Sequence, residues 1–426
     1  MRSRAEKGRG TQGAGGARLE RVKQFLLPMV AGMTATKRDL LNWVQELGLE
    51  ALADVFESEV LALSGEKGRH RADRTHHRWG STPTELPFGG RRIRVERPRV
   101  RTKSGREVRL PSVRRFQAED PLPDRVVEQI LLGVSTRGYA ASLGPAPPGV
   151  KGRGTSKSAA SRHLVERMGR KVEDYLSRSL GDVKLLGLML DGIEVAKHTV
   201  IVALGISEDG SKLPLGLWQG STENATLCTA LLQDLLQRGL KADGRLLCVI
   251  DGGKGIRKAL GDVLGDLAVI QRCQLHKRRN LRDHLPKSAQ LHVDRVLREA
   301  YASTKADTAR KRLRGLVSWL ESNGHEGAAA SLREGMEETL TVLKLELPTS
   351  LRRSLSTTNA IESMLSSVRH VSRNVKRWKG GAMVRRWVAM GVIAAQKRFR
   401  RIKGHRDMSA LFKALRRHSD LEERVA

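Results

Sequence analysis

The 426-residue sequence has only three cysteines, Cys228, Cys248 and Cys273, and their spacing is not that of a paired framework. So few cysteines, in an odd number, exclude a disulfide scaffold and are typical of a reducing compartment. No uncharged apolar run approaches the roughly 18 residues that a membrane span requires. The first residues are basic and glycine-rich, without the apolar centre of a secretion signal. We therefore expect a soluble, cytoplasmic protein.

Acidic residues are also scarce relative to basic ones. The chain has 46 Asp and Glu against 78 Lys and Arg, which gives a formal net charge of +32. Such an excess implies a polyanionic partner. Nucleic acid is favoured over an anionic membrane surface, because no basic helix carries a full apolar face of aromatic residues. The length predicts roughly two to four domains with ample hydrophobic core.

The segment after the basic arm has a helical pattern. Apolar residues at helical spacing over Lys37–Leu63, interrupted at Gly48, predict two short helices. The polar stretch Arg69–Trp79 predicts a linker. Its adjacent histidines, His76 and His77, are more typical of a solvated loop than of a metal site, because no other ligands stand nearby in sequence.

An Arg-rich segment follows over Leu86–Arg115. Arginine alternates there with Ile, Val and Leu in two runs joined by Lys103-Ser104-Gly105, which predicts a β-hairpin. The segment has eleven Lys and Arg against two Glu. A solvated face would mix the charge signs, so phosphate contact is favoured over that alternative. The candidate DNA-binding residues of this hairpin are Arg92, Arg94, Arg97 and Arg99.

A helix pair is predicted next. The apolar pattern over Asp124–Leu143, a break rich in Pro and Gly, and a second helix with Ser156 as its N-cap resemble a helix-turn-helix. The outward residues Lys157 and Arg162 would contact DNA. Helix pairs are also common in proteins that never touch DNA, and only the surrounding charge favours the DNA-binding interpretation.

From Val183 the pattern becomes mixed α/β. Strands are predicted at Leu185–Ile193, Thr199–Ile206 and Lys212–Trp218, then a helix at Asn224–Gln237, a strand at Arg245–Asp251, a helix from about Gly255 and a strand at Leu267–Ile270. Three hairpin-linked strands followed by helix, strand, helix and strand is the order of a ribonuclease H-like mixed sheet. A doubly wound sheet would alternate strand and helix from the start.

Two aspartates interrupt these strands. Six apolar or glycine residues precede Asp191, and Asp251 ends the apolar run Leu246–Ile250 before two glycines. Burying an ionised carboxylate in a hydrophobic core costs free energy unless another group pairs with it. Asp251 could instead cap the following turn.

A third acid, Glu362, stands at the border of a buried helical stripe. Asn359 and Glu362 have the spacing of a capping pair, which is the simpler explanation of Glu362. Alternatively, the three carboxylates hold two divalent cations, Mg²⁺ or Mn²⁺, for a displacement at phosphorus. The basic residues that follow would suit a phosphate backbone: Arg369, Arg373, Lys376 and Arg377.

Four stretches together resemble the mutator-type DDE transposase family of bacterial insertion sequences. They are "LDGIEVAKHTVIVALGISEDGSKLPLGLWQGSTEN", "VIDGGKGI", "QRCQLHKRRNL" and "STTNAIESM". The resemblance implies Asp191, Asp251 and Glu362 as catalytic metal ligands, Asn359 as a supporting residue and an α-helical insertion before Glu362. It assigns Cys273 and His276 to a short C-x-x-H signature, for which a structural role is favoured over half a zinc site. Lys277, Arg278 and Arg279 would contact DNA or substrate phosphate.

The resemblance implies a DNA transposase that binds terminal inverted repeats and target DNA as a homodimer or larger assembly, associated with the bacterial nucleoid. The alternatives are a catalytically inactive DNA-binding regulator and a ribonuclease H-like nuclease without strand transfer. The predicted segments are a basic disordered arm (1–36), an N-terminal helical region (37–85), an Arg-rich β-hairpin (86–118), a helix-turn-helix-like DNA-binding region (119–182), a catalytic domain in two parts (183–277 and 349–403), an all-α insertion (278–348) and a basic C-terminal tail (404–426).

Overall fold

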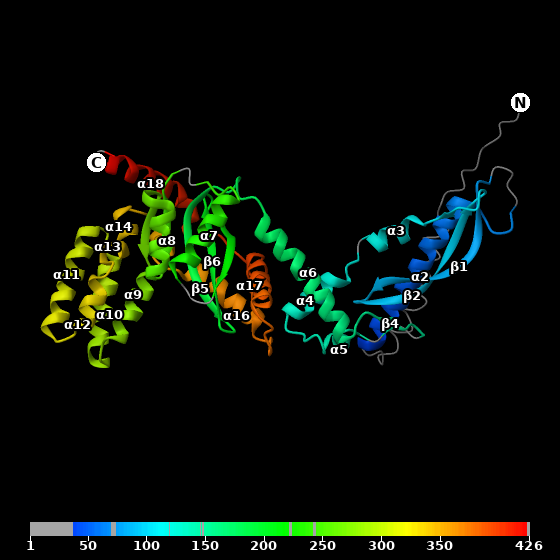
Figure 1. The fold of residues 1–426 in the computed structure, drawn as a ribbon, viewed down its shortest axis with the longest axis horizontal. Helices are drawn as coiled ribbons and strands as arrows, with labels where there is room; N and C mark the ends of the chain where they lie inside the picture. The colour runs from blue at the N-terminus through cyan, green and yellow to red at the C-terminus, as the bar shows by residue number, and fades with distance from the viewer. Residues whose placement is uncertain are drawn as a thin grey trace, which may run out of the picture. The chain divides into compact units, whose positions relative to one another are not determined.

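The computed structural model describes residues 37–69, 74–118, 120–144, 146, 149–220, 224–241 and 244–423 (Figure 1). The disordered arm expected over 1–36 lies outside the described residues. The chain divides into two compact units, one of Met1–Ile130 with Val134–Leu164 and one of Leu131–Gly133 with Val165–Ala426. The chain is an α/β protein with a mixed sheet, as expected.

The first unit combines a small sheet with several helices. Its helices are α2 (Lys37–Ser64), α3 (Pro111–Ala118), α4 (Leu122–Leu131), α5 (Tyr139–Ser142) and the start of α6 (Lys157–Ser177). Its strands are β1 (His76–Phe88), β2 (Arg91–Thr102), β3 (Glu107–Val108) and β4 (Gly152–Arg153). The sheet has the order β1-β2-β3, and β4 also pairs with β2. Phe56 and Val60 of α2 pack against Leu86 and Val100 of the sheet in a buried cluster.

The main hairpin begins earlier than the sequence predicted. The turn at Lys103–Gly105 is present, but it joins β2 only to the two-residue β3. The long partner of β2 is β1, which takes in His76–Trp79 and so corrects the linker predicted there. Two prolines hide β1 in the sequence. They are tolerated because β1 pairs only with β2, and an edge strand has one side without a hydrogen-bonded neighbour.

The prediction of two short helices before the hairpin is also wrong, because α2 runs unbroken from Lys37 to Ser64. Gly48 lies inside it. A Cβ at Gly48 would come within 2.9 Å of the Phe88 ring at the end of β1, so the glycine makes room for that ring. Glycine here serves a tertiary contact and does not end the helix.

The predicted helix pair is present with one change. Its first member is divided into α4 and the four-residue α5. Ser156 caps the second member, α6, since its Oγ accepts a hydrogen bond from the Ala159 N–H at 3.2 Å.

The sheet of the second unit agrees with the predicted strands to within about two residues at most ends. Its strands are β5 (Leu185–Val195), β6 (His198–Ser207), β7 (Lys212–Gly220), β8 (Leu246–Ile250) and β9 (Ala268–Arg272), in the order β7-β6-β5-β8-β9. The first three form antiparallel pairs, whereas β8 lies parallel to β5 and β9 parallel to β8. The strands read as continuous apolar runs because both faces of the sheet are covered.

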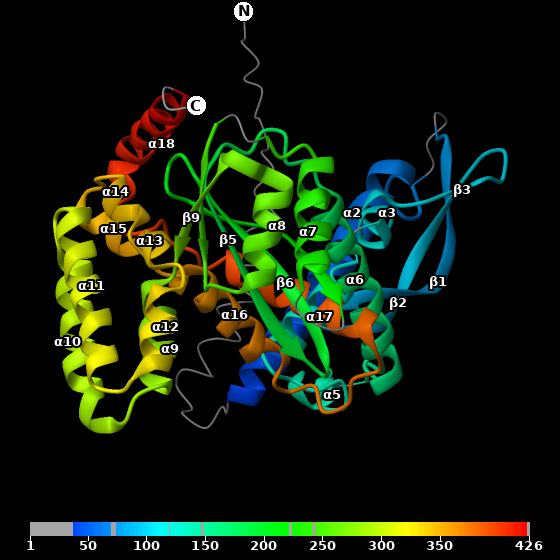
Figure 2. The ribbon, with the colours of Figure 1, turned by 60° about the vertical axis from the view of Figure 1, so that its left-hand side comes forward.

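Helices cover the two faces of this sheet (Figure 2). On one face, α7 (Ala225–Gln237) and α8 (Lys254–Leu264) pack on each other and on the strands. Their apolar residues form one buried cluster with Leu188 and Leu190 of β5 and Cys248 and Ile250 of β8. On the other face, α16 (Asn359–Ser372) contacts β5, and α17 (Gly381–Gln396) contacts β6 and β7.

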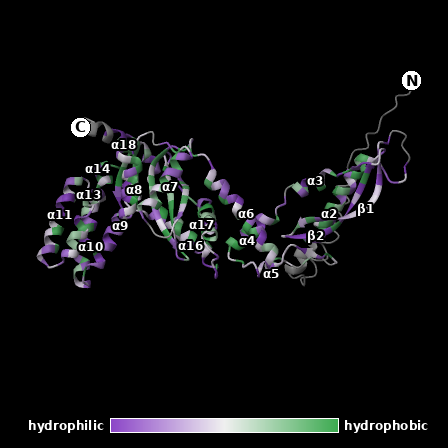
Figure 3. Cartoon of the chain, in the orientation of Figure 1, coloured by the Kyte–Doolittle hydropathy of each residue, from purple (hydrophilic) through white to green (hydrophobic). Residues whose placement is uncertain are grey.

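The chain between β9 and α16 is helical, which agrees with the predicted all-α insertion. Its helices are α9 (Gln274–Asp283), α10 (Lys287–Ala302), α11 (Ala306–Ser322), α12 (Glu326–Arg333), α13 (Met336–Thr339), α14 (Thr341–Lys344) and α15 (Thr349–Leu355). They bury a core of their own that includes Leu297, Leu313 and Leu332. In Figure 3 hydrophobic and hydrophilic residues alternate along α10 and α11, as expected of helices with one buried stripe.

The segment expected as a basic tail forms a short 3₁₀ turn, η2 (His405–Asp407), and a helix, α18 (Met408–Glu423). Met408 and Leu411 of this helix are buried. The tail therefore belongs, at least in part, to the folded unit.

Candidate active site

Asp191 and Asp251 lie at matching positions on neighbouring parallel strands. Leu188 of β5 pairs with Cys248 of β8, and Met189 pairs with Val249. The separation in sequence between Asp191 and Asp251 is the same as in these pairs. The parallel register, extended by two residues, therefore brings the two aspartates side by side where β8 ends.

The alternation of side chains along the strands decides which face the aspartates occupy. Leu188 and Leu190 belong to the cluster beneath α7 and α8, as do Cys248 and Ile250. Because successive side chains point to opposite faces, Asp191 projects to the other face, where α16 packs on β5. Each aspartate also accepts a hydrogen bond from a nearby backbone N–H, Asp191 from Gly192 and Asp251 from Gly253, both at 2.8 Å.

Glu362 reaches this face from the first turn of α16. The helix does not begin as the capping-pair interpretation predicted. Thr358 is the N-cap residue, whereas Asn359 is the exposed first residue of the helix. The Glu362 carboxylate therefore does not close a capping box with Asn359. Instead its Oε1 accepts a hydrogen bond from the Thr358 hydroxyl at 2.6 Å. The supporting role of Asn359 stays a prediction.

The three carboxylates interact electrostatically. Burial, the negative charge of Asp251 and, least, that of Glu362 together raise the pKa of Asp191 to about 7, against the lowering effects of the Gly192 N–H and His276. Burial and neighbouring carboxylates both disfavour the ionised form of Asp191, and a bound cation would stabilise that form. The cost of an ionised carboxylate at Asp191, which the sequence predicts, is present in the structure as this raised pKa.

Cys273 and His276 lie beside Glu362. Cys273 is the buried N-cap of α9, and its backbone N–H donates to the Ile250 carbonyl at 2.7 Å. His276 Nδ1 lies 3.8 Å from Glu362 Oε1. The hydrogen bond with Cys273 raises the pKa of His276, against the effect of burial. Burial opposes the thiolate of Cys273, but hydrogen bonds with His276 and Thr358 leave its pKa below the ordinary value.

One ligand atom each of Cys273, His276 and Glu362 lies within 4.8 Å of the others. The residue types and this spacing keep the zinc alternative open on geometry alone. The Thr358 hydroxyl shares this space, at 3.4 Å from Cys273 Sγ and 3.3 Å from His276 Nδ1.

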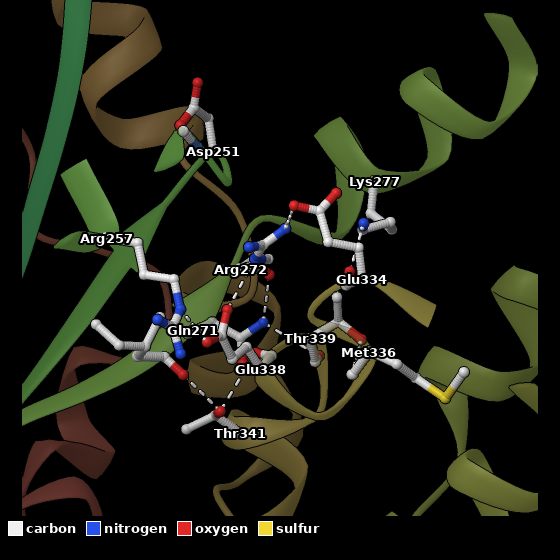
Figure 4. A network of polar contacts seen from close by, with 12 residues as sticks. Asp251, Arg257, Gln271, Arg272, Lys277, Glu334, Met336, Glu338, Thr339 and Thr341 are labelled. Atoms are coloured by element: carbon white, nitrogen blue, oxygen red, sulfur yellow. Dashed lines mark hydrogen bonds and ion pairs between the residues drawn. The ribbon is translucent and has the colours of Figure 1, made fainter. Parts of the chain in front are cut away.

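A polar network fixes the insertion next to Asp251 (Figure 4). Arg272, the last residue of β9, donates from Nε to Glu338 at 2.7 Å, and Arg257 of α8 donates to the same carboxylate at 2.6 Å. The Gln271 side chain donates to the Thr339 carbonyl at 3.1 Å and accepts from a backbone N–H of α14 at 2.9 Å. These bonds connect α13 and α14, near the C-terminal end of the insertion, to β9 and α8.

The basic residues after His276 have different environments. Lys277 is buried, and its Nζ donates to the carbonyls of Ser331 and Glu334 at 2.6 and 2.8 Å, so its contacts hold α9 to the end of α12. Arg278 lies 3.4 Å from Asp294 of α10. Neither placement presents the charge to a DNA backbone, and DNA contact by these two residues stays a prediction.

Arg279, in contrast, is half exposed and lies 3.9 Å from Glu362 Oε2. Its predicted contact with DNA or substrate phosphate stays a prediction, and its place beside Glu362 follows from the spacing of three residues from His276, which puts both on one face of α9. Thr358 was not among the predicted site residues. For Thr358 the preference of threonine for N-cap positions was the available signal.

The other candidate DNA-binding residues divide into exposed and paired side chains. Arg369, Arg373, Lys376 and Arg377, which follow Glu362, are exposed, as are Lys157 and Arg162 of α6. In the hairpin, Arg92 pairs with Asp120, and Arg97 and Arg99 both pair with Glu107, whereas Arg94 is exposed. The paired arginines stabilise the first unit, and their contact with phosphate stays a prediction.

Comparison with known proteins identifies a matching family and several relatives of this chain. A family model described as "Transposase, Mutator family" matches residues 22–401. A probable transposase for an insertion sequence element of Corynebacterium diphtheriae is 29% identical over 184 residues, covering 43% of this chain and 52% of the relative. The transposase for insertion sequence element ISRM5 of Rhizobium meliloti (strain 1021) is 28% identical over 357 residues, covering 82% of this chain and 83% of the relative.

A third relative is the transposase for insertion sequence element IS256 in transposon Tn4001 of Staphylococcus aureus. It is 25% identical over 267 residues, which cover 61% of this chain and 66% of the relative. The matched region spans about half of the Corynebacterium relative's length and most of the Rhizobium relative's. Among the helices that the structure describes, none is long and apolar enough to cross a membrane.

Proposed function

Because this chain belongs to the Mutator family of transposases, we propose that it cleaves and joins DNA strands at a divalent-metal site formed by Asp191, Asp251 and Glu362. The observation that carries the proposal is the parallel register of β5 and β8, which brings Asp191 and Asp251 side by side on the face where α16 packs with Glu362. The raised pKa of Asp191, caused by burial and by the charges of Asp251 and Glu362, agrees with it. Such mutual repulsion is expected where carboxylates share a site, and perturbed pKa values gather at functional sites.

The fold supports the same proposal. The strand order β7-β6-β5-β8-β9, with three antiparallel strands followed by parallel ones, fits the ribonuclease H-like sheet that the sequence predicts. The positions of the three carboxylates fit the DDE arrangement that the sequence predicts. Asp191 lies on the central strand β5, Asp251 follows the parallel strand β8, and Glu362 lies on α16, which packs on β5.

The donor set fits Mg²⁺ or Mn²⁺. Three carboxylates offer hard oxygen atoms, which these cations prefer, and their negative charges attract divalent ions. When bound, the cations supply activation of the attacking oxygen and stabilisation of the leaving oxygen. The chain's own residues hold this set in place: the parallel register sets the aspartates, and packing of α16 on β5 sets the glutamate.

The reaction we propose has two steps. In the first, water attacks a phosphodiester, the P–O3′ bond breaks, and the departing oxygen takes a proton to become a free 3′-hydroxyl. In the second, that hydroxyl attacks a phosphodiester of the target, forming a new P–O3′ bond and releasing the target's own 3′-hydroxyl. The exposed Arg369 of α16 and Arg373, the C-cap residue of that helix, would contact the phosphate backbone. Coordinated joining of two ends implies a homodimer or larger assembly.

A duplex bearing one end of the DNA element that encodes the chain tests the first step. We expect Asp191→Asn, Asp251→Asn and Glu362→Gln each to abolish Mg²⁺-dependent cleavage. Glu194→Gln, at an exposed position on the same strand as Asp191, serves as the matched control and should cleave normally. Unchanged activity in any of the three variants would exclude that residue from the site.

Pre-cleaved ends with free 3′-hydroxyls test the second step. Their insertion into a target duplex is expected of a transposase. Cleavage without insertion would indicate a nuclease, and specific binding of the element's ends without either activity would indicate an inactive regulator.

A further inference from the structure

We propose that Thr358 is a positioning residue that fixes the carboxylate of Glu362, and this inference rests on the function proposed above. Thr358 is fully buried, with 0% of its surface exposed, and its hydroxyl lies 2.6 Å from Glu362 Oε1. The hydroxyl oxygen of Thr358 also lies 3.4 Å from Cys273 Sγ and 3.3 Å from His276 Nδ1. One hydroxyl is thus the common contact of three side chains from two distant parts of the sequence.

The number of protons determines the direction of these bonds. A threonine hydroxyl has one hydrogen to donate and two lone pairs to accept with, whereas a carboxylate only accepts. The short bond to Glu362 therefore takes the hydroxyl proton. Its lone pairs can accept from the Nδ1–H of His276, whereas Cys273 Sγ accepts the backbone N–H of Thr358. In this arrangement the C-x-x-H residues hold Thr358, and its hydroxyl holds Glu362.

The local helix structure indicates that this contact is not ordinary capping. A threonine at an N-cap normally accepts a hydrogen bond from a backbone N–H of the first turn, which stabilises the helix. The Thr358 side chain makes no such bond. Its backbone N–H is directed to Cys273 Sγ at 3.4 Å, and its hydroxyl is directed to Glu362. The Thr358 hydroxyl thus binds the Glu362 carboxylate and does not cap the helix.

The same geometry disfavours a zinc ion held by Cys273, His276 and Glu362. The ligand atoms of the three residues lie within 4.8 Å of one another. Zinc would need to lie about 2.0 to 2.3 Å from each of them. The Thr358 oxygen already lies within 3.4 Å of an atom of all three and would compete with such an ion for these atoms. The cluster is therefore a hydrogen-bonded support for Glu362.

The test measures Mn²⁺ binding to the full-length protein, from the electron paramagnetic resonance of free Mn²⁺, beside Mg²⁺-dependent cleavage. Thr358→Val removes the hydroxyl with little change of shape and should weaken Mn²⁺ binding by about 10- to 100-fold, the usual cost of losing a group that orients a ligand. Thr358→Ser keeps the hydroxyl and should bind close to wild type.

A matched control separates this effect from a general loss of stability. Thr339 is equally buried, and its hydroxyl donates to the Met336 carbonyl at 2.7 Å, away from the carboxylates. Thr339→Val should lower the unfolding midpoint and leave Mn²⁺ affinity unchanged. If Thr358→Val loses its cooperative unfolding transition, Thr358→Ala decides in its place, because deletion of atoms creates no clash.

Wild-type Mn²⁺ affinity in Thr358→Val, or an equal loss in Thr358→Val and Thr358→Ser, would overturn the positioning role. Asp191→Asn in the same assay reports on the proposed function. If Asp191→Asn loses Mn²⁺ and Thr358→Val does not, the site stands and only the role of Thr358 fails. If Asp191→Asn binds Mn²⁺ like wild type, the proposed site itself is wrong and the inference fails with it.

Discussion

Replacing Asp191 by asparagine should stabilise the metal-free protein while it abolishes cleavage. Burial and the charges of Asp251 and Glu362 raise the pKa of Asp191 from its ordinary value of 3.8 to about 7. Every pKa unit between the unfolded and folded values corresponds to about 1.4 kcal/mol. The full difference sets a ceiling of roughly 4 kcal/mol, and partial exposure to solvent reduces the expected effect to about 1 to 3 kcal/mol.

The pH dependence of this effect has a definite sign. The folded state binds the Asp191 proton more tightly than the unfolded state, so the wild type loses stability as the pH rises from about 4 to about 7. Below about pH 4 both states are protonated and the loss is absent, whereas above about pH 7 it is complete. Asparagine carries no charge at any pH. The difference in stability between variant and wild type should therefore grow across this window.

Urea unfolding in the presence of EDTA, at about pH 5 and about pH 8, measures the difference. Addition of Mg²⁺ should then raise the midpoint of the wild type, because a ligand that binds only the folded state stabilises it, and should leave the variant unchanged. Glu194→Gln, exposed on the same strand, should change neither value. An Asp191→Asn variant that is no more stable than wild type at about pH 8 would refute the electrostatic reasoning.

Three further predictions concern packing and charge. Gly391→Ala should lower the free energy of unfolding by about 1 to 3 kcal/mol, because the added Cβ would fall 2.9 Å from a backbone atom of α16. Gly315→Ala is the control, because the added Cβ would meet open space, and it should raise the free energy of unfolding by about 0.5 to 1 kcal/mol. Lys277→Met should cost about 1 to 3 kcal/mol, by leaving two carbonyls without a donor, and should not alter the salt dependence of DNA binding; a reduced salt slope would indicate phosphate contact instead. Alanine at Arg369 or Arg373 should each reduce that slope by about one with an unchanged unfolding midpoint, and an unaltered slope would exclude a phosphate contact.

The central sheet could be predicted from sequence because its signals are local. Buried strands covered on both faces appear as apolar runs, and the turns between β5, β6 and β7 have the residues that turns require. The two aspartates were visible for the same reason, since a charged residue is conspicuous within an apolar strand. Their register then followed from the parallel pairing of β5 and β8.

The errors occur where a contact distant in sequence overrides a local signal. Gly48 suggests a helix end, but Phe88 from the hairpin occupies the space that a side chain would need. Strand β1 has a polar and proline-containing sequence that is acceptable only at a sheet edge. Lys277 belongs to a basic run typical of a surface, yet the end of α12 folds over it and supplies the carbonyls that bind its ammonium group.

The placement of Glu362 depends on how the insertion begins and ends. The Gln274 N–H, in the first residue of α9, donates to the Ser356 carbonyl just before α16 at 3.0 Å, and the neighbouring Cys273 N–H donates to Ile250 at 2.7 Å. The two ends of the insertion therefore meet at its base, one residue before Asp251. These two bonds hold the start of α16 beside the end of β8. Because Glu362 lies in the first turn of α16, they fix its position against the two aspartates.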